Sequence, residues 1–242
     1  VFMLLAAMNF ATHFLAWREK SLRQYLHDAE AVAVIALILA SCLGVAVFLQ
    51  WQGTYPSFWT ALRHASFNLV SIATDCGFAS VDFSQWPIFA PMWMLLLSCI
   101  AASSGSTGGG IKMIRTLILF KQAGREFQKL LHPASVNPMK IGGSVVPNNI
   151  VFAVLGFIFL YFMTVVTLTF ALLISGLDFI SAFSAVIACI NNAGPGLGVV
   201  GPASNYGVLT DFQTWVCTTA MLVGRLEIFT VLILFTPQFW RR

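Results

Sequence analysis

Two short polar stretches carry the residue types that could hold a cation through backbone oxygens. Residues 74–78 read TDCGF, and residues 191–195 read NNAGP. Carbonyl oxygens that face a common axis can replace the hydration shell of a cation. Glycine permits the positive φ values that turn successive carbonyls toward the same side. We therefore expect a cation path lined by the carbonyl oxygens of Thr74, Asp75, Cys76, Asn191, Asn192 and Ala193.

The carboxylate of Asp75 has two possible roles beside such a path. It could bind the ion directly, or it could form hydrogen bonds behind the loop while the carbonyl of Asp75 coordinates the ion. We favour the second arrangement. The plainer alternative, that both stretches are ordinary turns between membrane spans, is disfavoured because they recur at matched positions of the chain.

A third polar stretch, residues 103–112, reads SSGSTGGGIK and interrupts an otherwise apolar run between Trp86 and Phe120. Each glycine costs a helix about 1 kcal/mol relative to alanine, so this stretch should break the helix. Broken backbone at membrane depth is tolerated only where protein buries it or where it lines a water-filled cavity. We expect a loop inside a polar conduit. The alternative is a surface loop before an amphipathic helix, with Lys112 anchored at the interface.

Repeated elements should position these loops. Long apolar segments at 29–51 and 150–174 each suffice to cross a bilayer. Short apolar helices at 58–72 and 179–190 lead directly into the two polar loops. A second long segment then completes each unit, at 86–120 and at 212–235. The sequence thus predicts a duplication with a period of about 117 residues and divides into residues 1–28, 29–120, 121–149 and 150–242.

The composition supports an all-α membrane protein. Hydrophobic residues make up 58% of the 242 positions, charged residues 9%, and the mean hydropathy is +0.84, whereas soluble domains are about 25% charged. The net charge of +4 lies in connecting segments, so nucleic-acid binding is not expected. Five cysteines are scattered singly, which disfavours a metal site or a disulfide framework.

The distribution of charge predicts the orientation in the membrane. Most basic residues lie in or near the segments 18–23, 115–140 and 241–242. The side that carries the two polar loops has Arg63 as its lone basic residue and several acidic ones. By the positive-inside rule, the basic side is cytoplasmic, and the polar loops enter the membrane from outside.

Arg225 lies within the last apolar segment. A charge inside a membrane span is costly and usually faces a cavity or a partner. We predict that Arg225 points toward the ion path, pairs with carbonyls or hydroxyls of residues 103–110, and forms an electrostatic barrier. The alternative is that its side chain reaches back to the membrane interface. Glu227, two positions on, should face another side of the helix.

Four motifs, at residues 74–78, 104–112, 191–196 and 224–227, together resemble the C-terminal half of the membrane subunits of the Trk/Ktr/HKT superfamily of potassium-uptake proteins. The resemblance covers nearly the whole chain. It implies four helix–pore helix–filter loop–helix units around one potassium-channel-like pore, of which this chain holds the third and fourth. Residues 1–28 would then be the end of the second unit's inner helix and a cytoplasmic connector.

The resemblance also implies roles for individual residues. The potassium-binding filter would comprise Thr74, Asp75, Cys76, Gly77, Asn191, Asn192, Ala193 and Gly194. The intramembrane gate below it would comprise Gly105, Ser106, Thr107, Gly108, Gly109, Gly110 and Arg225. Only the glycines match the TVGYG strands of strict potassium channels, so looser selectivity for potassium over sodium is expected.

The implied assembly is a homodimer in the bacterial inner membrane with a cytoplasmic, TrkA-like nucleotide-binding regulatory subunit. Potassium would be the substrate, no covalent cofactor is expected, and a nucleotide such as NAD or ATP would act only through that partner. An ion-coupled secondary transporter, a proton or sodium symporter with a midplane site, is the alternative. An enzyme, such as an intramembrane protease using Ser104 or Ser106, is not expected.

Overall fold

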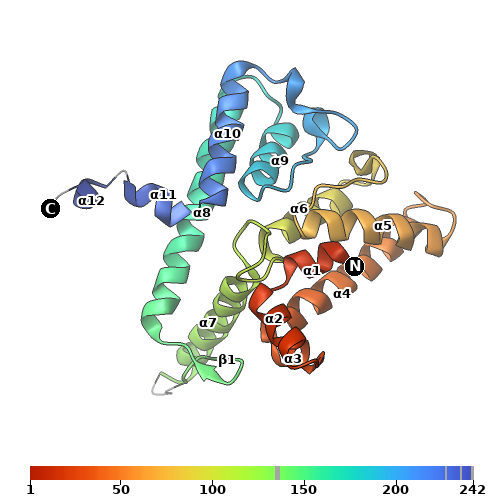
Figure 1. The fold of residues 1–242 in the computed structure, drawn as a ribbon. Helices are drawn as coiled ribbons and strands as arrows, with labels where there is room; N and C mark the ends of the chain where they lie inside the picture. The colour runs from red at the N-terminus through yellow and green to blue at the C-terminus, as the bar shows by residue number, and fades with distance from the viewer. Residues whose placement is uncertain (134–136, 227, 235, 241–242) are drawn as a thin grey trace.

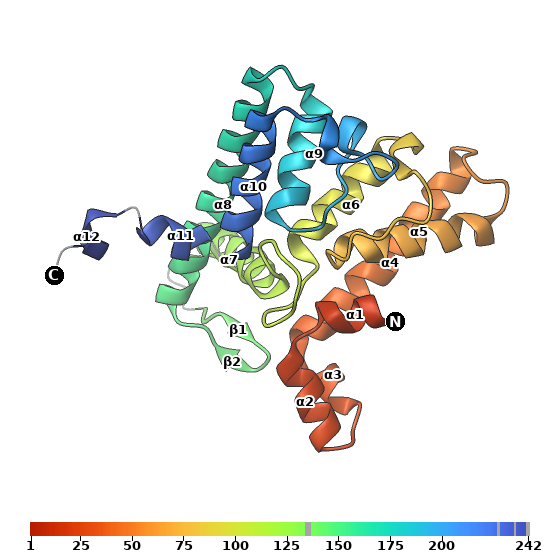
Figure 2. The ribbon, with the colours of Figure 1, turned by 45° about the horizontal axis from the view of Figure 1, so that its top comes forward.

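The computed structural model describes residues 1–133, 137–226, 228–234 and 236–240. Its helices fall into two groups with the 103–112 loop between them (Figures 1 and 2). The first group contains α4 (Ala29–Trp51), α5 (Phe58–Ala73) and α6 (Phe89–Ile100); α7 (Met113–Leu131) follows it in the chain and packs through Ile118 against Val151 of the second group. The second contains α8 (Asn148–Ile174), α9 (Phe179–Ile190), α10 (Asp211–Arg225) and α11 (Ile228–Leu234). The remaining elements are α1 (Phe2–Ala7), α2 (Phe10–Arg18), α3 (Arg23–His27), α12 (Pro237–Trp240), strands β1 (Lys140–Ile141) and β2 (Ser144–Val145), and three short 3₁₀ turns at Phe83–Gln85, Gly198–Val200 and Tyr206–Val208.

The long and short apolar helices form where the sequence predicts them. Helices α4 and α9 have the expected bounds, and α5 and α8 differ from the expected bounds by one or two residues. Within the described residues, α4 and α8 are the two helices long and apolar enough to cross a membrane. Side chains cap several of these helices. The carboxylate of Asp178 accepts a bond from the Ser181 amide at 3.0 Å, which lowers the pKa of Asp178 and begins α9.

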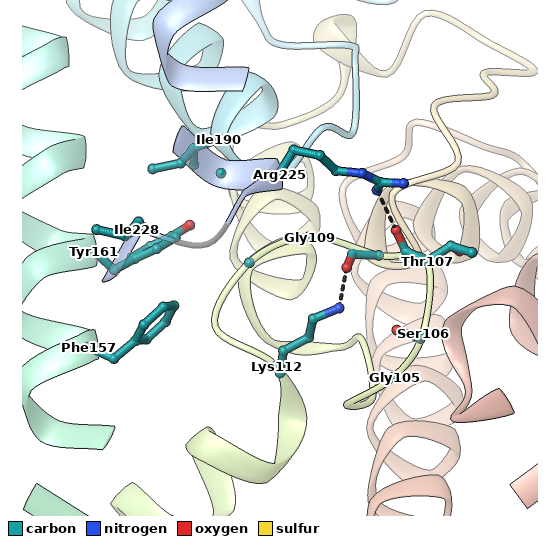
Figure 3. A pocket seen from close by; sticks show the side chains of 13 residues that line it. Gly105, Ser106, Thr107, Gly109, Lys112, Phe157, Tyr161, Ile190, Arg225 and Ile228 are labelled. Carbon is teal, nitrogen blue, oxygen red and sulfur yellow. Dashed lines mark hydrogen bonds between the residues drawn. The ribbon is translucent and has the colours of Figure 1, made fainter. Parts of the chain in front are cut away.

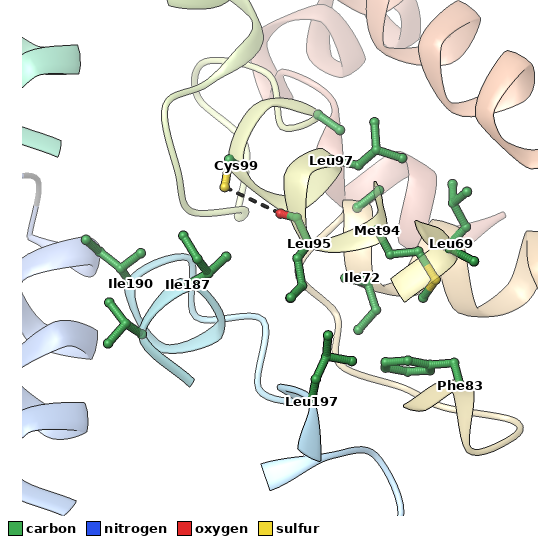
Figure 4. Close-up of a cluster of buried hydrophobic side chains, with 14 of the residues drawn as sticks. Leu69, Ile72, Phe83, Met94, Leu95, Leu97, Cys99, Ile187, Ile190 and Leu197 are labelled. Carbon is green, nitrogen blue, oxygen red and sulfur yellow. Dashed lines mark hydrogen bonds between the residues drawn. The ribbon is translucent and has the colours of Figure 1, made fainter. Parts of the chain in front are cut away.

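A buried apolar cluster joins the two groups of helices. Side chains of α5, α6 and α9 meet there, among them Ile72, Met94 and Ile187 (Figure 4). Leu197, from the loop that follows α9, packs into the same cluster. Burial of these side chains therefore fixes both short helices, and with them the loops at their ends.

The helix between residues 86 and 120 is interrupted, as predicted, but its two parts differ from the expected bounds. Helix α6 begins at Phe89, because residues 83–85 form a 3₁₀ turn and Pro87 follows. Helix α7 continues past Phe120 to Leu131. The predicted connector 121–149 thus contains half of α7 and the hairpin of β1 and β2. The polar residues 121–131 are mostly good helix formers, which explains why the helix continues.

Two apolar segments expected as single helices are broken. The first divides at Met8–Asn9, where the Asn9 side chain accepts from the Ala11 amide and starts α2. The last divides after Arg225, where the weak helix former Gly224 precedes the end of α10. The continuous helix predicted for 212–235 is therefore wrong. Glu227, Phe235, Arg241 and Arg242 lie outside the described residues.

Helices α2 and α3, the end of α7 and the β hairpin lie toward one end of the molecule (Figures 1 and 2). These elements hold basic residues that the sequence analysis assigned to the cytoplasmic side, including Arg18, Arg23, Lys129 and Lys140. The basic residues thus gather at one end, and the side of the membrane that this end faces stays a prediction.

Candidate functional site

The two polar loops have the same backbone conformation. Asp75 and Asn192 adopt φ values of 57° and 58°, and Gly77 and Gly194 adopt 77° and 98°. Asparagine and aspartate tolerate this left-handed region better than most residues other than glycine. The positive φ values expected of the glycines are therefore present, and each loop has a second one that the sequence analysis did not predict.

The hydrogen bonds of the two loops also match. The Cys76 amide donates to Ser71 O at 2.8 Å, and the Ala193 amide donates to Ala188 O at 2.9 Å. The preceding amides, of Asp75 and Asn192, donate three residues back at 3.1 and 3.0 Å. This pair of bonds is the Schellman motif, which ends a helix with a residue in the left-handed conformation. The duplication predicted from the sequence thus extends to individual backbone bonds.

The two loops lie against one another. A Cβ atom added at Gly77 would be 2.5 Å from Ala193 O and 3.5 Å from a side-chain carbon of Pro195. A Cβ added at Gly194 would meet nothing within 4 Å. Gly77 is therefore required by a close approach between the loops, whereas Gly194 faces open space. The Gly194 carbonyl accepts a bond from the Tyr206 hydroxyl at 2.9 Å.

Gly108 and Gly109 of the 103–112 loop fit against the two polar loops. A Cβ at Gly108 would lie 3.1 Å from Asp75 Oδ2 and 3.8 Å from Thr74 O. A Cβ at Gly109 would overlap the backbone of Asn191. These positions need glycine because a side chain would push the three loops apart.

The side chain of Asp75 is turned toward the 103–112 loop. Its Oδ2 accepts the amide of Gly109 at 2.8 Å, and Oδ1 is buried without a hydrogen-bond partner among the described residues. This geometry agrees with the favoured arrangement, in which the carboxylate hydrogen-bonds behind the loop. Thr74 is also buried, and its hydroxyl donates back to Val70 O at 2.7 Å.

The side chain of Asn191 is fully buried in a polar network between helices. Its Oδ1 accepts from the Tyr161 hydroxyl of α8 at 2.8 Å. Its amide nitrogen donates to Ser98 Oγ of α6 at 2.8 Å. The network fixes the second loop from behind. The side chain of Asn192, in contrast, makes one long bond to Met221 O at 3.4 Å.

We predict that Tyr161→Phe weakens this network. Asn191 Oδ1 would lose its hydroxyl donor, and an unsatisfied buried acceptor costs about 1–3 kcal/mol. The Tm of the purified protein should fall, measured by thermal unfolding in detergent. Tyr55→Phe is the comparison: it removes a hydroxyl that accepts a longer bond, of 3.3 Å, from Trp86, and it should lower the Tm less than Tyr161→Phe. An equal Tm for the Tyr161 variant and the wild type would contradict the prediction.

Arg225 makes the contact predicted from the sequence. Its Nη1 donates to the carbonyl of Thr107 at 2.9 Å (Figure 3). The Lys112 ammonium donates to Gly108 O within the same loop, so Lys112 is turned into the loop and is not the interfacial anchor considered as an alternative. Both cations border a cavity of about 330 Å³ that extends along the loop from Gly105 to Gly110 and reaches Phe157, Tyr161 and Ile228.

Sequence reasoning missed two further supports of this loop. Glu30, in the first turn of α4, accepts the amides of Ser104 and Ile114. The break between α1 and α2 is the other: the carbonyls of Ala6 and Ala7 accept bonds from Thr107 and Ser103. The acidic residue at the start of an apolar span was a signal for the first. No local pattern indicated the second.

Two of the described helices are long and apolar enough to cross a bilayer. A third helix is broken, and other parts of the chain hold its broken backbone by hydrogen bonds. This combination is typical of a helical membrane protein. A family model described as "TrkH: Cation transport protein" matches residues 1–242. The chain belongs to the TrkH family of cation transport proteins.

Named relatives agree with this family. The chain is 42% identical over 241 residues to the Trk system potassium uptake protein TrkH of Halomonas elongata, covering 100% of the chain and 49% of that protein. It is 39% identical to TrkH of Escherichia coli strain K12, covering 100% and 50%. The crystal structure of the potassium transporter TrkH from Vibrio parahaemolyticus matches with a TM-score of 0.93 and 43% identity, over 99% of this chain and 51% of that one. The chain spans about half the length of these relatives.

Proposed function

We propose that this chain supplies the third and fourth units of a four-unit pore that carries potassium into the cell. The backbone carbonyls of Thr74, Asp75, Cys76, Asn191, Asn192 and Ala193 would form half of the selectivity filter. Gly77 and Gly194 would set its backbone. The related Trk proteins are named as potassium uptake proteins, which favours potassium as the substrate.

The observation that carries this proposal is the matched geometry of the two loops. Each follows a short apolar helix, each has two positive φ values at equivalent positions, and the loops contact each other at Gly77 and Ala193. Carbonyls repeated around an axis are what a dehydrated cation requires. The helix-ending bonds alone do not distinguish these loops, because the same pair of bonds also ends α4 at Gly53 and α8 at Gly176. The second positive φ in each loop and the contact between the loops are what support the proposal.

The 103–112 loop would be the gate. It packs against both polar loops, and the cationic groups of Arg225 and Lys112 donate to its carbonyls. A fixed positive charge beneath a cation filter would oppose conduction until the loop moves. The competing proposal, a proton or sodium symporter, rests on the same broken helix at membrane depth.

We further propose that the complete protein is a homodimer in the bacterial inner membrane, with the filter loops entering from outside. A TrkA-like regulatory subunit would bind its cytoplasmic side and carry the nucleotide. The basic residues around α2, α3 and the end of α7 supply a charged surface there.

Rubidium uptake tests the function. The complete open reading frame, coexpressed with its regulatory subunit, is expressed in cells that lack their own potassium uptake systems. We expect growth at low potassium and saturable rubidium uptake that potassium inhibits more strongly than sodium. Absence of uptake in the presence of the regulatory subunit would contradict the proposal. Uptake that stops when the proton or sodium gradient is collapsed at constant membrane potential would favour the symporter.

A further inference from the structure

Glu30 is a buried carboxylate whose position neither the filter nor the gate residues explain. It lies in the first turn of α4 and is 7% exposed. A buried acidic side chain at the end of an apolar helix needs hydrogen-bond donors to be stable there. Glu30 obtains them from a segment more than 70 residues further along the chain.

A single oxygen of Glu30 binds both ends of the 103–112 loop. Oε1 accepts the amide of Ser104 at 3.1 Å and the amide of Ile114 at 2.9 Å. Ser104 begins the loop, and Ile114 belongs to the first turn of α7. Amides of a first helical turn have no partner within the helix and favour an anion. The carboxylate therefore closes the base of the loop into a ring.

The base and the tip of the loop are held by different groups. Two backbone bonds join the ends of the loop, from the Ile111 amide to Cys99 O at 2.7 Å and from the Met113 amide to Ala102 O at 2.8 Å. Glu30 adds one side-chain bond to each end.

Nearer the tip, Asp75 accepts the amide of Gly109 and Arg225 donates to the carbonyl of Thr107. The contacts at the tip form only if the two ends of the loop stay in place, because the glycines between base and tip restrict the backbone little. Fixing the two ends of the loop reduces the number of positions that its tip can adopt.

Glu30 is itself held by neighbouring bonds. Its backbone amide donates to Asp28 Oδ1 at 2.9 Å, and Asp28 Oδ2 accepts from the Thr12 hydroxyl of α2 at 2.6 Å. The carboxylate is thus positioned by the junction of α2, α3 and α4. We propose that Glu30 is a positioning residue that keeps the base of the gate loop closed. The inference rests on the proposed gating role of that loop, although Glu30 does not line the cavity beside the loop.

The test measures how exposed the loop is, independently of transport. Ser106→Cys introduces a thiol into the loop of the complete protein. The rate at which a maleimide labels this thiol is measured in detergent, and the labelling rate of the protein without the added cysteine is subtracted. We expect Glu30→Ala to raise the rate about tenfold, since two charge-assisted bonds are lost. Glu30→Gln keeps the acceptor oxygen, so its labelling rate should lie within about twofold of the rate of the Ser106→Cys protein. Glu126→Ala, an exposed acidic residue on α7, is the matched control.

Should Glu30→Ala not reach the membrane, Glu30→Asp replaces it, because the shorter carboxylate cannot reach both amides. The same increase is then expected. Three outcomes would overturn the inference. The labelling rate could be unchanged in Glu30→Asp, it could rise equally in Glu126→Ala, or Glu30→Gln could be labelled as fast as Glu30→Ala. Faster labelling in a protein that transports no rubidium would support the inference about Glu30 and contradict the proposed function alone.

Discussion

Gly194→Ser is expected to lower rubidium uptake about tenfold, whereas Gly176→Ser leaves uptake near the wild-type level. Both glycines have a large positive φ, 98° and 92°, and both have open space where a Cβ would lie. Serine therefore brings a similar backbone strain of about 1–2 kcal/mol at either position. Only Gly194 lies in a proposed filter loop, where the strain would turn the neighbouring carbonyls away from the proposed ion path.

Uptake is measured per amount of protein in the membrane, in the same cells as the wild type. Equal loss of uptake in both variants would mean that strain alone inactivates the fold and that Gly194 has no special role. Full uptake in Gly194→Ser would remove this loop from the filter.

Gly77→Ser should be more severe than Gly194→Ser. It combines a φ of 77° with a Cβ only 2.5 Å from Ala193 O, so the two filter loops must separate. We expect it to reduce both the uptake and the amount of folded protein, whereas Gly194→Ser should reduce the uptake alone. A milder effect of Gly77→Ser would show that the two loops do not depend on their close approach.

Features with a local signal could be predicted from the sequence. The apolar length of 29–51 and 179–190 determined α4 and α9, and the glycines of 103–112 determined the break between α6 and α7. The contact between Arg225 and the loop could also be predicted, because a charge in an apolar helix needs a partner from a polar stretch. Whether these residues bind and gate potassium stays a prediction.

Features that depend on tertiary contacts could not be predicted. The break at Met8–Asn9 lies in an apolar stretch whose pattern favours a continuous helix. It is stabilised by hydrogen bonds from residues about 100 positions away. The carboxylate of Glu30 resembled an ordinary helix start until its partners at Ser104 and Ile114 were known. Such long-range pairs leave no periodicity in the sequence.

Arg225→Ala is expected to raise basal rubidium flux about tenfold or more. The guanidinium donates to Thr107 O, and a bond from a charged donor contributes about 1.5–3 kcal/mol, which is a factor of about 10–150 in the balance between closed and open loops. The same change removes one of the two positive charges that border the cavity and leaves Lys112. Both effects favour conduction. Flux is measured in liposomes that contain the complete protein without its regulatory subunit.

The controls separate the hydrogen bond from the charge. Lys129→Ala removes an exposed positive charge from α7, away from the cavity, and should leave the basal flux unchanged. Arg225→Lys keeps a charge beside the cavity but loses the planar group that reaches Thr107. If the charge is the main barrier, the lysine variant conducts like the wild type; if the bond to Thr107 holds the loop, it conducts like the alanine variant. A basal flux in Arg225→Ala no higher than in Lys129→Ala would exclude Arg225 from the gate, and the loop would then be held closed by Asp75 and Glu30 without it.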